Sequence, residues 1–466
     1  MAKLTFYGAV EGVTGSAYLL EVGNARVLLD CGLFQGSRKV EEANFDDFPF
    51  NPRTLDAVVL SHGHLDHSGR IPKLVSDGYS GPLHMTRATC ELIGVMLKDS
   101  AHLIQRDTEW ENKYRRRQHK KLLKPLYNLK DVEKTLDSCM GVPYGQLVQV
   151  AEGVTIRFRD AGHILGSAIV EVFVEENGNK KKLVFSGDLG NSCAALLRDP
   201  EIVEQADILL LESTYGDRNH RSMEESLQEF EDVMEEASIK GGNILIPAFA
   251  VGRTQEIIFR LGEMYQEGKL KQRAVYLDSP MAIEVTSIYN RYLHMFNEED
   301  KAQVQGNGSK DLKSFLPILH YSTTTEQSMR LNMIEKGAII IAGSGMCNGG
   351  RIRHHLRHNL SKKHAHVIMV GYQAMGTPGR ALVDGAKIFR LGRDKVVVKA
   401  GIHTIGGFSA HAGQSQLLEW AGHFTEPMPR LYLVHGEDDA KATLAGCFAE
   451  NGWQVSLPGP GESISL

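Results

Sequence analysis

The chain has 466 residues, of which 42% are hydrophobic and 23% are charged, a balance typical of a globular protein. Its length allows two or three domains, each with its own core. No apolar run is long enough to span a membrane and the start, MAKLTFYGAV, lacks a signal-peptide pattern, so we expect a cytoplasmic protein with no membrane partner. The net charge of −5 excludes a globally basic nucleic-acid binder, and a polyanionic partner would therefore need a local basic patch.

Cysteine usage excludes two further classes of protein. The six cysteines are scattered and form no CxxC pair, which argues against a zinc finger and against a disulfide framework. We expect single buried thiols at positions 31, 90, 139, 193, 347 and 447.

The first 210 residues predict two groups of short strands with helices between them. The first group contains KLTFYGAV, SAYLLEV, ARVLLDCG and LDAVVLSHG. Helical periodicity begins at about Thr86 and extends into a polar segment near residues 100–140. Strand patterns then return in VTIRFRDAGH, AIVEVFVEE and KKLVFSGD. This order fits a sandwich of two sheets covered by helices.

From about residue 207, strands alternate with helices. Three apolar runs each precede a helical stretch: DILLLES, GNILIPAFA and AVYLDSP. Further apolar runs follow in AIIIAGSG and AHVIMVGYQ, and the whole pattern predicts βαβ units in a parallel sheet. From about residue 403, short strands (RLYLVHGE, WQVSL) return around one helix, GQSQLLEWAGHF. We therefore predict an α/β domain inserted into a first domain that ends at the C-terminus.

Three histidines and an aspartate occupy six positions of the sequence SHGHLDHSG, directly after an apolar strand: His62, His64, Asp66 and His67. Clustered imidazoles repel one another when protonated and are costly to bury unpaired. Neutral imidazole and carboxylate are, however, the ligands of zinc and similar ions. The alternative is a histidine-rich exposed loop, which we disfavour because the cluster does not stand alone.

Three further strand ends carry a histidine or an aspartate beside glycine, in DAGHILGSA, VFSGDLGN and LYLVHGE. Taken singly, such a histidine is more often a packed residue. Two ions about 3.5–4 Å apart that share a hydroxide are a standard device for phosphoester hydrolysis. The combined set would provide His62, His64 and His163 for one ion and Asp66, His67 and His435 for the other, with Asp188 as the bridging carboxylate.

These residues resemble the motifs of the metallo-β-lactamase superfamily. Asp30 in LLLDCG is similar to its first motif, the histidine cluster to the second, His163 to the third and Asp188 to the fourth. More narrowly, the chain resembles the β-CASP nucleases, relatives of the pre-mRNA 3′-end cleavage endonuclease, and looks like a prokaryotic-type RNA-processing member. The residues that resemble the β-CASP motifs are Glu212 in LLLESTYGDR (motif A), His411 in GGFSAHAG (motif B) and His435 (motif C).

The resemblance spans essentially the whole chain and implies a fold. That fold is an αββα sandwich into which a parallel-sheet, Rossmann-like α/β domain, the β-CASP domain, is inserted. We expect residues 1–208 to form the first part of the metallo-β-lactamase domain, 209–402 the β-CASP domain, and 403–466 the C-terminal part with an RNA-metabolising motif.

The resemblance also implies an activity, namely a ribonuclease with two zinc ions per chain, for which Mn²⁺ is a substitute. A hydroxide held between the metals would attack RNA and leave 5′-phosphate and 3′-hydroxyl ends. In the family, a histidine at motif C accompanies RNA substrates, and the absence of a further domain after PGPGESISL favours endonuclease action. The alternatives are a 5′–3′ exoribonuclease, a small-molecule ester or lactone hydrolase, and a non-catalytic partner subunit. A homodimer is left open.

Four residues receive individual roles from the resemblance. Asp30 is expected to orient a metal-bound histidine, although an aspartate here could also cap a turn. Asp66 has two candidate tasks, ligating a metal and orienting the attacking hydroxide. His411 would face the phosphate and give a hydrogen bond or proton to the leaving 3′ oxygen, while Glu212 holds its ring and favours its protonated form.

Two basic features are candidates for RNA contacts. A glycine-rich turn before a basic helix could offer backbone amides to phosphate, and the alternative is an ordinary tight turn with a solvated helix. The stretch KYRRRQHKKLLKP, residues 113–125, carries seven Lys or Arg and no acid, and either grips RNA or is a solvated helix face. The candidate phosphate contacts are Ser344, Gly345, Met346, Arg253 and Arg351.

Overall fold

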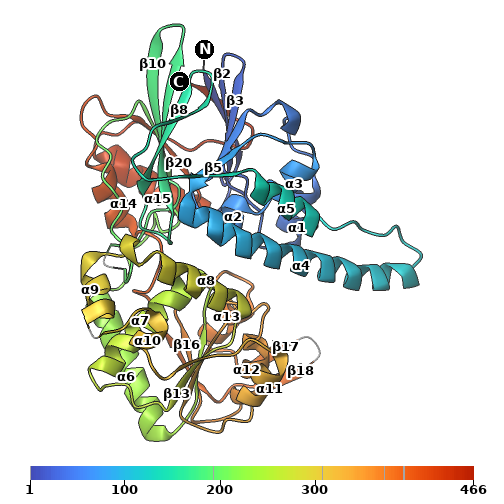
Figure 1. The fold of residues 1–466 in the computed structure, drawn as a ribbon, viewed down its shortest axis with the longest axis vertical. Coiled ribbons are helices and arrows are strands. Elements are labelled where there is room, and N and C mark those ends of the chain that lie inside the picture. Colours follow the sequence, from blue (N-terminus) through green and yellow to red (C-terminus); the bar gives the residue numbers. More distant parts are fainter. Residues whose placement is uncertain (1, 193, 307, 372, 392–393) are drawn as a thin grey trace. The chain divides into compact units, whose positions relative to one another are not determined.

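The computed structural model describes residues 2–192, 194–306, 308–371, 373–391 and 394–466, which fold into two compact units (Figure 1). The first unit contains residues up to 192, 199–219 and 411–466, and the second contains residues 194–198 and 220–410. The units therefore divide after Asn219 and Ala410 rather than at the expected residues 209 and 403.

Two seven-stranded mixed sheets form the first unit. One has the order β22 (Ser463–Ser465), β1 (Lys3–Gly8), β2 (Ala17–Val22), β3 (Ala25–Leu29), β4 (Ala57–Val59), β5 (Leu83–Thr86) and β6 (Cys139–Val142). The other has the order β21 (Val455–Ser456), β20 (Arg430–Val434), β11 (Ile208–Glu212), β10 (Asn179–Phe185), β9 (Ala168–Glu176), β8 (Val154–Asp160) and β7 (Val148–Ala151). The expected strand β11 thus belongs to this unit, because it pairs with β10 and β20.

The two sheets pack face to face around a core formed by alternate residues of their strands, such as Val154, Ile156 and Phe158 of β8. Two further cores lie on the outer faces of the sheets, under helices. The helices of this unit are α1 (Arg38–Glu42), α2 (Leu65–Ser68), α3 (Ile71–Ser76), α4 (Arg87–Arg117), α5 (Leu129–Asp137), α14 (Gln414–Ala421) and α15 (Asp438–Glu450). The predicted αββα sandwich is confirmed, although its C-terminal part contains two helices where one was expected.

A six-stranded, fully parallel sheet forms the second unit, as the strand–helix alternation predicted. Its order is β14 (Leu319–Tyr321), β13 (Ala274–Leu277), β15 (Ala338–Ala342), β12 (Ile244–Pro247), β16 (His366–Met369) and β19 (Gly401–Thr404), and β17 (Ile388–Leu391) pairs with β18 (Asp394–Val397) in a separate hairpin. All five residues of β15 are buried, as expected for a strand covered on both faces.

The helices of the second unit complete its α/β architecture. They are α6 (Met223–Lys240), α7 (Arg253–Gln266), α8 (Pro280–Arg291), α9 (Glu298–Gly306), α10 (Leu312–Phe315), α11 (Thr325–Leu331), α12 (Ile352–Asn359) and α13 (Pro378–Val383). Across the described part of the chain, no helix has the length and apolar character that crossing a membrane requires. The five described cysteines are free thiols, two of them fully buried, and Cys193 lies outside the described residues.

Candidate metal centre

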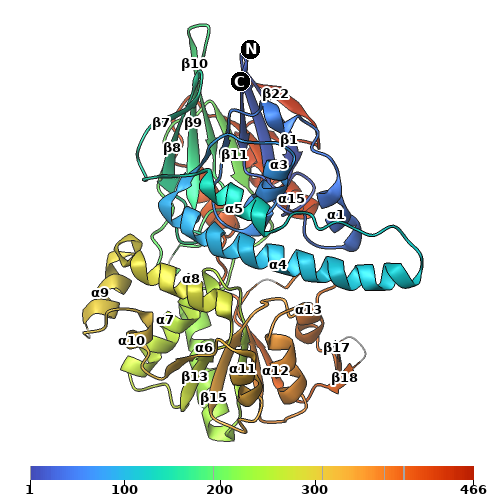
Figure 2. The ribbon, with the colours of Figure 1, turned by 45° about the vertical axis from the view of Figure 1, so that its right-hand side comes forward.

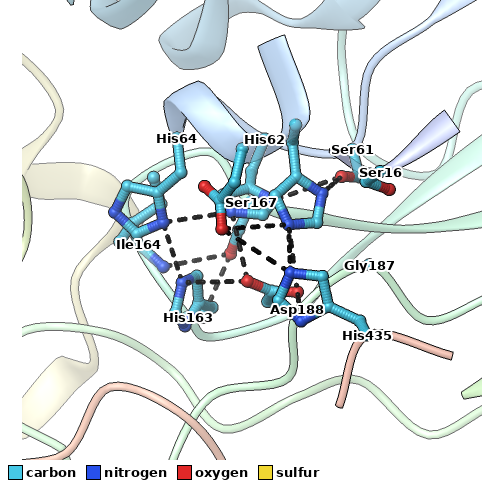
Figure 3. Close-up of polar contacts among 12 residues, drawn as sticks. Ser16, Ser61, His62, His64, His163, Ile164, Ser167, Gly187, Asp188 and His435 are labelled. Carbon is cyan, nitrogen blue, oxygen red and sulfur yellow. Dashed lines mark hydrogen bonds and ion pairs between the residues drawn. The ribbon is translucent and has the colours of Figure 1, made fainter. Parts of the chain in front are cut away.

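The strand directions of the first unit bring its polar strand ends to shared edges. The strands β10, β11 and β20 run parallel, and β8 has the same direction because both β8 and β10 pair antiparallel with β9. Their carboxyl ends carry Asp188, Glu212, His435 and His163 respectively. In the other sheet, β3 and β4 are parallel and end just before Asp30 and the histidine cluster. Figure 3 shows that side chains from both sheets meet at this place.

Three histidines and one aspartate form the first group of donors. Nδ1 of His64 lies 3.1 Å from Nε2 of His62 and 3.1 Å from Nε2 of His163. A Zn²⁺–N bond of about 2.0–2.1 Å places two tetrahedral nitrogen ligands about 3.3 Å apart, so these separations fit one ion. Oδ2 of Asp188 lies 3.5 Å from the His62 nitrogen and 3.6 Å from the His163 nitrogen.

The second group contains Asp66, His67 and His435. The Nε2 atoms of the two histidines lie 3.1 Å apart, and Oδ2 of Asp66 lies 3.6 Å from His435 Nε2. Oδ1 of Asp188 lies 3.3 Å from His67 Nε2 and 3.5 Å from His435 Nδ1. The two oxygens of Asp188 therefore face one group each, and its Oδ1 is buried without a hydrogen-bond partner among the described residues. An unsatisfied carboxylate oxygen among imidazole nitrogens suits a cation.

Asp30 lies beneath the second group and receives several hydrogen bonds. Its carboxylate accepts them from Ser16 Oγ (3.0 Å), from the backbone N–H of Ser61 (2.8 Å) and from Ser61 Oγ (2.9 Å). Nδ1 of His67 lies 2.7 Å from Oδ2 of Asp30. When Nδ1 carries the proton of this bond, the lone pair of Nε2 is directed toward Asp188 and His435. The carboxylate thus orients an imidazole rather than capping a turn.

Burial and charge set the protonation states of the donors, and most of those that shift take the form that metal binding requires. Burial lowers the pKa of His62 well below its usual range and that of His64 to about 4, so both rings are neutral at pH 7. For Asp66, burial raises the pKa, but the hydrogen bond with His435 and the nearby histidines outweigh it and lower the pKa to about 2. Burial also raises the pKa of Asp188, but the surrounding histidines outweigh it and hold this pKa well below its ordinary value of 3.8. Neutral imidazoles and ionised carboxylates are the forms that bind divalent ions. The exception is His67: burial lowers its pKa, but the carboxylates of Asp188 and Asp30 outweigh burial and raise the pKa well above 6.5, so this ring must release a proton when an ion binds.

Two further residues of the first unit, His411 and Glu212, lie beside this centre. A β-bridge joins His411 to Gly190, which follows Asp188 closely in the chain. Oε1 of Glu212 accepts a hydrogen bond from the N–H of Leu189 (2.6 Å) and lies 3.3 Å from His411 Nδ1. Burial lowers the pKa of His411, but the charge and hydrogen bond of Glu212, together with Asp188, raise it to about 9. The ring is therefore held as an imidazolium, with 22% of its side chain exposed.

The candidate phosphate contacts all belong to the second unit. Arg253 is buried in an ion pair with Glu256. The guanidinium of Arg351 contacts Asp278 (2.7 Å) and donates to the carbonyls of residues 322 and 323. In the glycine-rich turn, Ser344 and residue 349 bond to each other, so the turn is closed by its own hydrogen bonds. A phosphate role for these residues remains a prediction, and both arginines already have partners.

A third group of possible ligands lies in the second unit and had no signal in the sequence. It comprises Glu236 of α6, His366 of β16 and His403 of β19. Nδ1 of His366 and Nε2 of His403 lie 3.0 Å apart in a ring-to-ring hydrogen bond, and Glu236 pairs with Lys240. One nitrogen of each histidine is thus engaged with the other ring and the carboxylate is engaged with a lysine, whereas Nε2 of His366 is buried without a hydrogen-bond partner among the described residues.

The hydroxyl residues around the centre were also missed by sequence reasoning. Ser61 Oγ lies 3.1 Å from His62 Nδ1, and Thr214 Oγ1 lies 3.2 Å from His435 Nδ1. Ser61 directly precedes His62, and Thr214 closely follows Glu212. This adjacency to a motif residue was the only available signal in the sequence.

Comparison with known proteins agrees with this architecture. Three family models match the chain: the metallo-β-lactamase superfamily over residues 10–235, the Beta-Casp domain over 254–382, and the Zn-dependent metallo-hydrolase RNA specificity domain over 395–458. Ribonuclease TTHA0252 of Thermus thermophilus is 40% identical over 100% of both chains. Transcription termination factor FttA of Methanocaldococcus jannaschii is 30% identical over 94% of this chain and 67% of its own length. A crystal structure of a protein of unknown function from Enterococcus faecalis shares the fold, with a TM-score of 0.56, 14% identity and full coverage of both chains.

The fold and the donor set define a metal-dependent hydrolase with a metallo-β-lactamase fold. The donor chemistry, with the neutral imidazoles of His62 and His64, the ionised carboxylates of Asp66 and Asp188 and a buried Asp188 oxygen that has no hydrogen-bond partner among the described residues, fits divalent ions. With a full-length relative at 40% identity and all three domain models matched, the chain belongs to the β-CASP family of the metallo-β-lactamase superfamily. The family resemblance drawn from the sequence motifs is confirmed.

Proposed function

We propose that this chain is a zinc-dependent ribonuclease that cleaves RNA phosphodiester bonds internally and leaves 5′-phosphate and 3′-hydroxyl ends. The proposal rests on the position of Asp188 between the two donor groups. Its Oδ2 faces the first group and its Oδ1 faces the second. RNA as the substrate is supported by the 40% identity to a ribonuclease over its whole length and by the RNA specificity domain model over residues 395–458.

Two zinc ions would be held by the two donor groups, with Asp188 reaching both. Bound there, they would polarise the phosphoryl oxygens and lower the pKa of a bound water toward neutrality. Ser61 and Thr214 would hold the rings of His62 and His435 through Nδ1, as Asp30 does for His67. Mn²⁺ suits the same oxygen and nitrogen donors and would replace zinc.

The chain's own residues would manage the protons of the reaction. Asp66, with 21% of its side chain exposed, would accept a hydrogen bond from the attacking water and align it with phosphorus. The water oxygen joins phosphorus and the water releases a proton to solvent, while the bond from phosphorus to the 3′ oxygen breaks. His411 would give its proton to that departing oxygen, since Glu212 keeps the ring protonated at neutral pH. The expected ends, 5′ phosphate and 3′ hydroxyl, follow from this balance.

One digestion experiment tests the proposal. A single RNA is labelled at its 5′ end in one tube and at its 3′ end in another, and is incubated with protein and zinc or with protein and chelator. Internal fragments that appear early from both labels, only with zinc, are the expected result. Mononucleotides released from the 5′ end would instead indicate a 5′–3′ exoribonuclease.

The control is a His64→Ala protein purified in the same way, because a contaminating ribonuclease would act in both preparations. Parallel assays with a generic ester and a lactone cover the remaining alternative. Their hydrolysis without any RNA cleavage would contradict the ribonuclease proposal and favour a small-molecule hydrolase.

A further inference from the structure

The outer half of α4 has little core beneath it, since Ile104, which is partly buried, is its one residue packed against a described core cluster. The last buried side chain of this helix is Ala101, and no described residue from 102 to 126 is buried. The helix nevertheless continues to Arg117, which at 1.5 Å per residue extends it by about 24 Å. Figures 1 and 2 both show α4 projecting beyond the other elements of the first unit. A helix that buries no apolar face gains little stability in water. Packing against the core therefore does not explain why α4 continues this far.

The end of the extension is tied into a defined hairpin. The side chain of Asn112 both donates to the carbonyl of Leu123 (2.9 Å) and accepts from its N–H (2.8 Å). Nη1 of Arg115 donates to the carbonyl of Lys121 (2.8 Å). The returning segment is thereby held against the last turns of the helix. We call residues 102–125 the basic arm.

Positive charge is concentrated at the tip of the basic arm. The acids lie nearer its base, where Asp107 is 3.8 Å from Arg106 and Glu111 is 3.4 Å from Arg115. The cations of the tip are exposed and make no ion pair with any described residue. They are Lys113, Arg116, Arg117, Lys120, Lys121 and Lys124. In a chain with a net charge of −5, this is the local basic patch that a polyanion needs.

Two aromatic rings stand among these charges. Trp110 is 71% exposed and Tyr114 is 54% exposed. Four residues apart on a helix, their side chains lie on the same face. Exposed aromatic faces beside Lys and Arg are the combination on which unpaired bases stack while the cations contact the backbone phosphates.

We propose that the basic arm is a docking site for single-stranded RNA, where it holds the strand outside the catalytic centre. The proposal deepens the proposed function and rests on it for the source of the RNA. A second copy of the chain is a poorer occupant, because two tips with six unpaired cations each would repel. An anionic membrane is also a poorer one, since the acids Asp107, Glu109 and Glu111 lie on the same helix and a vesicle offers no base to Trp110.

Tryptophan fluorescence provides a direct test, because Trp110 alone is exposed. The other two tryptophans, Trp420 and Trp453, are 6% and 8% exposed. Titration of the full chain with an unstructured 30-nucleotide RNA should quench the emission of Trp110. In the Trp110→Phe protein the quenching should vanish while the affinity persists, because phenylalanine also stacks. Quenching that survives in this variant would overturn the proposal.

Charge and stacking are then tested separately. In the charge variant, five cations are changed to Gln: Lys113, Arg116, Arg117, Lys120 and Lys121. Its Kd for the RNA should rise roughly 10- to 100-fold. The slope of log K against log salt concentration should become less steep by about 0.7 for each phosphate contact that is lost. A Trp110→Ala/Tyr114→Ala variant should raise Kd roughly 5- to 150-fold, and Phe45→Ala, which also removes an exposed ring, should not. The charge control changes five exposed lysines of the second unit to Gln: Lys310, Lys336, Lys363, Lys387 and Lys395. An equal loss of affinity in that control would contradict the proposal.

Cleavage kinetics separate this proposal from the proposed function. The charge variant should raise KM for the 30-nucleotide RNA and leave kcat, as well as the cleavage of a five-nucleotide RNA, unchanged. Absence of cleavage in every protein, with quenching and charge dependence intact, would reject the ribonuclease and keep the docking site. Normal cleavage, with RNA binding that the arm variants do not change, would keep the ribonuclease and reject the docking site. If the protein binds no RNA but binds anionic lipid vesicles, the arm is a membrane-docking site instead. If it binds no RNA but self-associates, and the charge variant abolishes this, the arm is a contact between copies of the chain.

Discussion

At the scale of single residues, the metal centre depends on the atoms that face away from it. One hydroxyl, Ser61 Oγ, lies 2.9 Å from Asp30 Oδ2 and 3.1 Å from His62 Nδ1, so it links two parts of the site. The backbone contributes too, because Asp30 and His435 both have positive φ angles of 57° and 52°. Asp and His tolerate this region better than most residues, and such conformations gather at functional sites.

We expect Asp30→Asn to weaken metal binding without unfolding the chain. The amide can present an N–H where His67 Nδ1 now has its acceptor, and the ring would then favour the wrong tautomer. Removal of such an orienting partner typically costs roughly 10- to 100-fold in metal affinity. Competition with a chromophoric chelator measures the affinity, and Asp47→Asn, at an exposed carboxylate of the same unit, is the control. Equal affinities in the two variants would show that Asp30 does not act through His67.

For His411, the metal content and the reaction rate can be separated. If the ring assists the departing oxygen, His411→Ala keeps its metal while turnover falls roughly 10²- to 10⁴-fold. Glu212→Gln should give a milder defect, since a hydrogen bond to the ring remains but the charge that raises its pKa is lost. Metal analysis beside single-turnover kinetics on RNA checks both, with His64→Ala as the variant expected to lose metal. Loss of metal from His411→Ala would make the residue a ligand instead.

At the scale of elements, a buried glutamate joins three strands of the second sheet. Glu171 of β9 receives Arg157 and Arg159 from β8 and Lys182 from β10. Burial raises its pKa, but the hydrogen bonds from these three cations outweigh burial and lower the pKa to about 2. Because the pKa is lower in the folded chain than its ordinary 4.5, the stabilisation is complete above pH 4.5 and is lost as the pH falls toward 2.

Glu171→Gln should therefore reduce stability at pH 7, and the difference from wild type should shrink between pH 4.5 and 2. Urea midpoints measured across this range give the difference directly. Glu175→Gln is the matched control, since Glu175 lies on the same strand, is exposed and, within the described ranges, forms an ion pair with Lys180 alone. A difference that stays constant with pH would mean that the ion pairs of Glu171 do not stabilise the fold.

Elements with a continuous apolar run were predictable, and those defined by distant partners were not. The buried strands β4 and β15 stand out as AVV and AIIIA between turn residues. By contrast, α15 was missed because its sequence, DDAKATLAGCFAE, has a weak apolar periodicity and follows a turn already assigned to His435. The third ligand group was missed because His366 and His403 meet only through the pairing of β16 with β19.

At the scale of the whole molecule, the order of elements alone could not place the unit boundaries. The strand β11 precedes a run of alternating helices and strands, and its sequence suits the inserted sheet equally well. Pairing with β20, more than 200 residues away, assigns it to the first unit and brings Glu212 to the metal centre. The motif histidines and aspartates, in contrast, are marked locally by strand-end position and glycine neighbours, and the structure brings them together in the two donor groups, while their role as metal ligands stays a prediction.

Both donor groups that meet at Asp188 belong to the first unit, whereas the Glu236, His366 and His403 group belongs to the second. Ligand binding stabilises the part of a chain that forms the site, by about 4 kcal/mol at a free concentration of about 1,000 times Kd. For a unit of this size, we expect zinc to raise one calorimetric transition by roughly 8–16 °C and to leave the other unchanged.

The assignment of these transitions follows from two variants measured in the same way. His64→Ala should lose most of the zinc-dependent shift, because His64 lies between His62 and His163 in the first donor group. His403→Ala should keep the shift and the zinc content of about two ions per chain, because the hydrogen bond between His366 Nδ1 and His403 Nε2 and the ion pair of Glu236 with Lys240 compete with an ion in the second unit. A zinc-dependent rise that disappears in His403→Ala would instead place an ion in the second unit. That result would require the ring-to-ring hydrogen bond to open on metal binding.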